Sequence, residues 1–175
     1  NAAWPQGHGN ERHRSAHPAL SAAPQLAWSV NIGAGDSRKQ RITATPVSGG
    51  GRVYTLDSGA KVSAVSPAGG LLWQRDLLRA NDSADEGTGG GLAYHDGVVY
   101  ISSGFGLLTA LDAATGEQVW QQKLNATGSG QPAVHDGLVY LVAGGETGWA
   151  VKAKDGRIAW TISASPSPAN VLGSP

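Results

Sequence analysis

The stretch Ala110–Trp120, which reads ALDAATGEQVW, decides the fold of this chain. It combines a turn of the form Asp-x-x-Thr-Gly with a single tryptophan four residues after the glycine. Such a stretch is either one part of a cofactor pocket or one corner of a repeated structural unit. A catalytic element is present once in a chain, whereas a packing element recurs with each unit.

The pattern occurs in three copies. Residues 91–124 align with residues 131–164 at an offset of 40, and a shorter copy at about 42–78 lacks one residue in its final turn. The tryptophan closes every copy, so we interpret it as a packing residue that each unit requires. Burial of about 200 Å² of indole contributes roughly 5 kcal/mol before entropy costs. The recurring tryptophans are Trp73, Trp120 and Trp160.

Each copy carries the signals of four short antiparallel strands. The runs RVYTL, VVYIS and LVYLV are rich in β-branched and aromatic residues, and the preceding GGG and HDG stretches are typical of hairpin turns. No window of about 11 residues keeps an apolar helical period between capping residues, so helix is expected to be nearly absent. Tandem units of this kind predict an all-β fold, a β-propeller of four-stranded antiparallel blades, with a solenoid as the structural alternative.

The repeats also predict the organisation of the chain. Closed propellers have about four blades or more, so three complete units predict a partial propeller whose native chain continues past Pro175. The predicted boundaries are an N-terminal segment at 1–32 with a blade-closing strand near 26–32, and a propeller at 33–175 with blades at about 42–78, 91–124 and 131–164 and the start of a further blade at 173–175.

Composition excludes several classes of function. The 13 basic and 13 acidic side chains balance without a Lys/Arg cluster, so nucleic acid is not an expected partner. The absence of Cys excludes a disulfide framework and Cys-ligated zinc or iron–sulfur sites. No apolar run approaches the ~18 residues of a membrane helix. Because the chain has no Met, we expect a targeting segment outside this sequence.

Other clusters of polar residues are interpreted as surface features. His8, His13 and His17 with Glu11 lie in a Pro- and Ala-rich stretch that offers no rigid element to hold metal ligands. The acidic loop at 81–87, NDSADEG, lacks the ligand spacing of an EF-hand. No serine lies in a nucleophile elbow. We therefore predict no catalytic residue, no cofactor-binding residue and no metal site.

At the motif itself the chain resembles the pyrroloquinoline-quinone-type (PQQ-like) propeller repeat family, whose blades carry the docking motif Ala-x-Asp-x-x-Thr-Gly-x-x-x-Trp. The resemblance covers about 42–175, and the N-terminal stretch AWPQGHGNERHR is similar to the first segment of the family. It implies that the motif residues dock each blade on a neighbour. These structural residues are Ala64, Gly70 and Trp73 in the first copy, Ala110, Asp112, Thr115, Gly116 and Trp120 in the second, and Ala150, Gly156 and Trp160 in the third.

The resemblance implies one of two functions. The family contains quinone-dependent alcohol and sugar dehydrogenases, as well as outer-membrane assembly lipoproteins of the BamB type. Its alcohol dehydrogenases hold their quinone with an adjacent Cys pair and a calcium site, and this chain has no Cys. The resemblance therefore favours a non-enzymatic scaffold of the outer-membrane β-barrel assembly machinery. The alternatives are a quinoprotein alcohol or sugar dehydrogenase and an envelope adhesion module.

A BamB-type role implies a location and partners. The chain would lie in the periplasm at the inner face of the outer membrane, held by a lipid anchor outside this sequence. It would bind the periplasmic part of the BamA-type insertase and other subunits of the assembly complex.

The predicted partner contact lies in the stretch SPSPANVLGSP at 165–175. Apolar side chains on a proline-stiffened loop lose little conformational entropy on binding, so they are suitable interface anchors. An inter-blade loop at the corresponding place in BamB-like proteins contacts the insertase, which implies the same role here. The alternative is that the leucine packs on its own blade. The predicted contact residues are Asn170, Val171 and Leu172.

Overall fold

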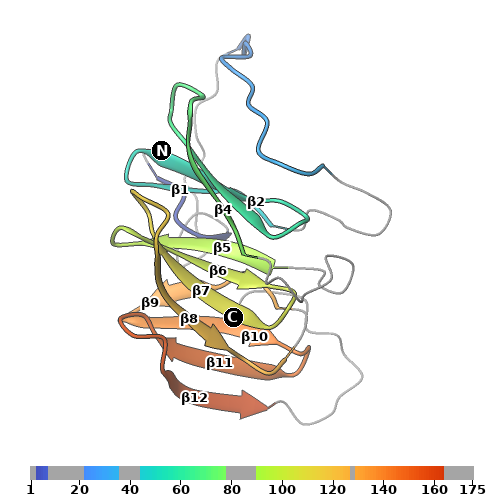
Figure 1. Ribbon diagram of the computed structural model, residues 1–175, viewed down its shortest axis with the longest axis vertical. Coiled ribbons are helices and arrows are strands. Elements are labelled where there is room, and N and C mark those ends of the chain that lie inside the picture. The colour runs from blue at the N-terminus through green and yellow to red at the C-terminus, as the bar shows by residue number, and fades with distance from the viewer. Residues whose placement is uncertain (1–2, 8–21, 36–43, 78–89, 127–128, 164–175) are drawn as a thin grey trace.

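Three four-stranded antiparallel sheets are stacked in chain order (Figure 1). They come from a computed structural model of the chain, which describes residues 3–7, 22–35, 44–77, 90–126 and 129–163. Blade 1 comprises β1 (Val47–Gly49), β2 (Arg52–Leu56), β3 (Lys61–Val65) and β4 (Leu71–Asp76). Blade 2 comprises β5 (Gly90–His95), β6 (Val98–Ser103), β7 (Leu107–Asp112) and β8 (Gln118–Lys123). Blade 3 comprises β9 (Ala133–His135), β10 (Leu138–Ala143), β11 (Thr147–Lys152) and β12 (Ile158–Ser163).

In every blade each strand pairs with the strand that follows it in the chain. The prediction of an all-β chain built from four-stranded antiparallel blades is therefore confirmed, and the described residues contain no α-helix. The solenoid alternative is wrong, because each repeat closes its own antiparallel sheet. No helix in the described ranges is long and apolar enough to cross a membrane.

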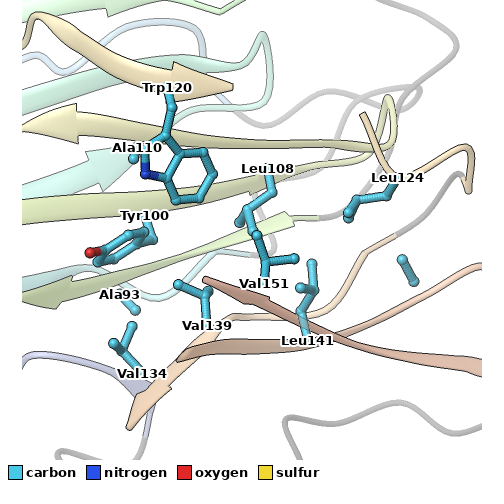
Figure 2. Close-up of a cluster of buried hydrophobic side chains, with 11 residues drawn as sticks. Ala93, Tyr100, Leu108, Ala110, Trp120, Leu124, Val134, Val139, Leu141 and Val151 are labelled. Carbon is cyan, nitrogen blue, oxygen red and sulfur yellow. The ribbon is translucent and has the colours of Figure 1, made fainter. Parts of the chain in front are cut away.

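The first three strands of blade 2, β5 to β7, are buried on both faces, and this explains their apolar character. Along β6, Val99 and Ile101 enter a core shared with blade 1, whereas Tyr100 enters a core shared with blade 3. Figure 2 shows the second core, in which side chains of blade 2 lie over Val139 and Leu141 of β10. Since alternate residues of a strand point to opposite faces, a strand between two blades must be apolar at nearly every position.

The first hairpin of each blade has the turn that its sequence predicts. Asp96 and Gly97 both have positive φ, at 48° and 78°, and Asp136 and Gly137 repeat this geometry at 47° and 73°. Two successive residues with positive φ define a type I′ turn, whose twist matches that of the flanking strands. Asp-Gly is a favoured sequence for this turn because both residues tolerate the left-handed region.

Residues Trp4–Gln6, which we call the N-terminal strap, connect the first strands of all three blades. Trp4 exchanges two backbone hydrogen bonds with β1, at 2.9 and 2.7 Å. The carbonyl of Pro5 accepts a bond from the amide of Tyr94 in β5, and Oε1 of Gln6 accepts one from the amide of Val134 in β9 at 2.9 Å. Gln6 is only 5% exposed. The strap therefore links three repeats that are far apart in sequence.

The segment at 22–35 lies against blade 1 without forming the strand expected near 26–32. It is attached through side chains: the indole nitrogen of Trp28 donates to the carbonyl of Pro67 at 2.8 Å, and the hydroxyl of Ser63 donates to the carbonyl of Ile32 at 3.0 Å. A strand needs the backbone of a partner strand, and none pairs with this segment among the described residues. Within the described ranges the segment therefore contains a docking tryptophan, Trp28, but no backbone hydrogen bonds of a strand pair.

We expect Trp120→Ala to lower the free energy of unfolding by about 3–5 kcal/mol, because it empties a core position that is 9% exposed. Trp160→Ala is the matched control, since it removes the same side chain at the same repeat position, where the residue is 47% exposed. The control should cost about 1 kcal/mol. Urea denaturation followed by far-ultraviolet circular dichroism measures both, and equal losses would reject the packing role of Trp120.

Candidate functional site

Blade 1 docks on blade 2 through a tryptophan that covers a glycine turn. The indole nitrogen of Trp73 donates to the carbonyl of Ala113 at 3.2 Å, and its ring lies over Gly116. A Cβ on Gly116 would lie 2.7 Å from that ring, and the residue has a φ of 73°. Arg75 donates from Nε to the carbonyl of Gly116 at 2.7 Å. Two side chains of β4 therefore hold the turn of the next blade.

The same docking contact recurs along the chain. Trp120 donates to the carbonyl of Ala153 at 2.8 Å and covers Gly156, whose added Cβ would lie 2.7 Å from the ring. Trp28 covers Gly69 of blade 1 at the same distance, 2.7 Å. Each blade thus receives an indole from the segment before it, and each of blades 1 and 2 presents one to the blade after it.

The alanine of the motif separates two aromatic rings on one face of each blade. In blade 2, Ala110 pairs with Tyr100 on one side and with Trp120 on the other, and the two ring centroids lie 5.9 Å apart. Any larger side chain between them would push the indole away from its turn. The equivalent fully buried alanines are Ala64, between Tyr54 and Trp73, and Ala150, between Tyr140 and Trp160.

The Asp and Thr of the motif shape the turn on which the tryptophan rests. Oδ1 of Asp112 accepts hydrogen bonds from the amides of Ala114 and Thr115, at 2.9 and 2.8 Å. The hydrogen bonds from Thr115, first its amide and then its hydroxyl, hold the pKa of Asp112 below its ordinary value. The hydroxyl of Thr115 also accepts a bond from the amide of Glu117 at 3.2 Å. These bonds fix the backbone that carries Gly116.

In blade 1 the structure differs from the expected assignment of Gly70. The glycine beneath Trp28 is Gly69, which has a φ of 85°, whereas an added Cβ on Gly70 would meet Oγ of Ser66 at 3.2 Å. The turn is one residue shorter than in blade 2, and the amide of Ser66 closes it by donating to the carbonyl of Gly70 at 2.8 Å. The deletion moves the glycine with positive φ back by one residue, from position 70 to position 69. The shorter turn in the sequence could have indicated this shift.

Blade 3 presents its aromatic face uncovered in the described part of the chain. Trp160 is 47% exposed, and its ring lies 6.0 Å from Tyr140. Together with Trp149 and Ile162 these residues line a groove of about 310 Å³. The indole nitrogen of Trp149 is buried without a hydrogen-bond partner.

Several predicted features lie outside the described residues. They include the proposed contact residues Asn170, Val171 and Leu172, the histidine-containing stretch at 8–21 and the acidic loop at 81–87. Within the ranges that the structure describes, no group of three His, Cys, Asp or Glu side chains could hold a metal ion.

Known proteins are similar to this chain in sequence and in fold. A family model described as outer membrane protein assembly factor BamB matches residues 58–175. The dehydrogenase subunit of the quinone alcohol dehydrogenase of Komagataeibacter europaeus is 34% identical over 168 residues, which are 83% of this chain and 22% of that protein. The chain spans 14% to 22% of the length of the first curated relatives that it matches.

The solved structures that resemble this chain also include both an alcohol dehydrogenase and an assembly factor. The quinohemoprotein alcohol dehydrogenase of Comamonas testosteroni superposes with a TM-score of 0.74 and 26% identity, over 95% of this chain and 28% of that chain. BamB of Moraxella catarrhalis superposes with a TM-score of 0.58 and 21% identity, over 70% of this chain and 36% of that chain. The second likeness supports the fold alone.

The prediction that the chain is not an enzyme is contradicted by these matches. Curated relatives from Komagataeibacter europaeus, Comamonas testosteroni and Pseudomonas putida are quinone-dependent alcohol dehydrogenases, which are enzymes. The prediction relied on the missing Cys pair. A Cys pair is only one way of holding a quinone, and this chain covers 14–22% of the length of these dehydrogenases.

We expect Gly116→Ala to destabilise the chain more than Gly137→Ala does. Both residues have a φ of 73°, so both variants carry the cost of a left-handed alanine, about 1–2 kcal/mol. An added Cβ at Gly137 meets nothing within 4 Å, whereas at Gly116 it meets the ring of Trp73. The overlap should add about 1–3 kcal/mol in urea denaturation. Equal destabilisation would show that the ring does not rest on this turn.

Proposed function

Because the chain belongs to the PQQ-like repeat family of outer membrane protein assembly factor BamB, we propose that it binds the periplasmic part of the BamA-type insertase and so assists the folding and insertion of outer-membrane proteins. The observation that carries this proposal is the family model, which covers residues 58–175 and therefore parts of all three blades. The proposed location is the periplasm, at the inner face of the outer membrane.

The docking contacts support such a role because they make the blades a rigid support for loops. Each indole is fixed by a hydrogen bond to the neighbouring blade, at 3.2 Å for Trp73 and 2.8 Å for Trp120. Loops that emerge from blades fixed in this way lose less freedom on binding than loops on a mobile framework. The proposed partner contact is the loop that carries Asn170, Val171 and Leu172.

We expect Leu172→Asp in the full-length protein to abolish copurification with the insertase, because a buried carboxylate would replace an apolar anchor. The melting temperature should stay unchanged. Leu26→Asp is the control, since Leu26 is 85% exposed in a segment outside the proposed contact, and it should leave both copurification and melting unaffected. A large fall in melting temperature for Leu172→Asp would instead assign Leu172 to the core of its own blade.

A second candidate function is quinone-dependent alcohol oxidation, which the 34% identity to the dehydrogenase subunit over 168 residues favours. This chain covers 22% of that dehydrogenase, and its described residues hold no group of three His, Cys, Asp or Glu side chains that could bind a metal ion. No reaction step is therefore derived for this candidate.

Titration of the full-length protein with pyrroloquinoline quinone and calcium tests the second candidate. Dye reduction that requires an alcohol, the quinone and the protein together would support it. Dye reduction equal to that of a protein-free control would reject it, whatever the result of the insertase experiment.

A further inference from the structure

We propose that the groove between blades 2 and 3 binds a peptide segment of a partner protein, one that carries a carboxylate beside an apolar side chain. The groove has a volume of about 440 Å³ and lies where the hairpin and turn ends of the two blades meet. Val98, Tyr100 and Val119 form its apolar floor, and Lys152 and Lys154 lie on its rim. This proposal uses none of the residues of the proposed loop contact and does not depend on the insertase being the partner.

The repeat supplies an internal comparison, because the same position between blades 1 and 2 is filled. There the ring of Tyr94 stacks on Tyr54, with centroids 5.8 Å apart and an interplanar angle of 10°. The ring also lies directly against Gly49 and Gly50, where any Cβ would overlap it. The residue at the position of Tyr94 in blade 3 is Val134, so the stacked ring is missing between blades 2 and 3.

A second side chain fills the position between blades 1 and 2. Arg52 donates to the carbonyl of Gly50 at 3.1 Å, and its guanidinium interacts electrostatically with the Tyr54 hydroxyl and the Asp112 carboxylate. The equivalent of Arg52 in blade 2 is Val98, which is shorter and apolar. The groove is therefore open because two large side chains of its counterpart are replaced by valines.

The charge at one position of the groove also changes sign. The equivalent of Asp112 in blade 3 is Lys152, so an internal Arg–Asp arrangement is replaced by a valine and an exposed lysine. Lys154 adds a second cation, and Asp96 is the acidic residue on the opposite side of the groove. The lining of the groove therefore carries two ammonium groups and one carboxylate, and a carboxylate from a partner would balance this charge.

The apolar floor defines the rest of the ligand. Val119 is 54% exposed, so an apolar side chain placed over it removes surface from water on both partners. Lysines on an exposed rim form ion pairs of low energy. Binding of a short peptide is therefore expected to be weak, with a dissociation constant of about 0.1–1 mM.

Titration of the ¹⁵N-labelled full-length chain with the peptide acetyl-Phe-Glu-Leu-Asp-amide tests the proposal. We expect saturable shifts of the backbone amides of Val98, Val119 and Lys152, weakened at 0.5 M salt by roughly fivefold because the ion pair is screened. The uncharged analogue acetyl-Phe-Gln-Leu-Asn-amide should bind at least about tenfold more weakly. The absence of saturable shifts with the acidic peptide would overturn the proposal.

The double variant Val98→Arg/Lys152→Asp introduces the residue types of Arg52 and Asp112 at the equivalent positions between blades 2 and 3. The fold already accepts these residues between blades 1 and 2. The double variant should keep the melting temperature and bind the acidic peptide at least about tenfold more weakly, because it removes the cation and fills the groove. Lys154→Glu is an independent surface variant with the same expected direction. Lys123→Asp, an exposed lysine outside the groove, is the charge control and should bind as the parent chain does.

Unchanged binding in both the double variant and Lys154→Glu would overturn the proposal. Normal peptide binding by a chain that fails to copurify with the insertase would reject the proposed function and leave the groove assignment intact.

Discussion

The contact between an indole and the glycine turn of the next blade is the constraint on which the rest of the structure depends. It requires a glycine with positive φ beneath the ring, because a Cβ there would overlap the indole. It requires an alanine beside the ring, and a carbonyl at hydrogen-bond distance from the indole nitrogen. Since these requirements fall on two successive repeats, each repeat constrains the sequence of its neighbour.

The repeats are alike at the docking contacts and different at their turn ends. Gly116 and Gly156 occupy equivalent positions with the same φ of 73°, whereas Arg52 and Tyr94 of one inter-blade position are valines in the next. Packing therefore restricts the middle of each blade and leaves the rim free to vary. In a repeat protein of this kind the function-specific residues are those that depart from the repeat while the docking contacts stay intact.

The repeat pattern of the sequence was sufficient to predict the blades, but it did not predict the contacts of the strap. The Asp-Gly hairpins depend on adjacent residues, and the tryptophans recur at the same place in each repeat, so alignment of the chain with itself was enough to find them. The strap and Gly69 were missed, because one depends on distant backbone groups and the other on the length of a single turn. The prediction that the chain is not an enzyme was wrong, because it relied on a missing Cys pair in a chain that covers only 14–22% of its dehydrogenase relatives.

The strap also sets an order of events during synthesis. Trp4–Gln6 leave the ribosome before the blades that they bind, since the amide of Val134 that Gln6 binds lies 128 residues later in the chain. The blades are built from neighbouring strands and can form as they emerge, because contacts between adjacent strands close only short loops. The strap residues are therefore made before the blades but reach their final positions after them, and they close over sheets that are already folded.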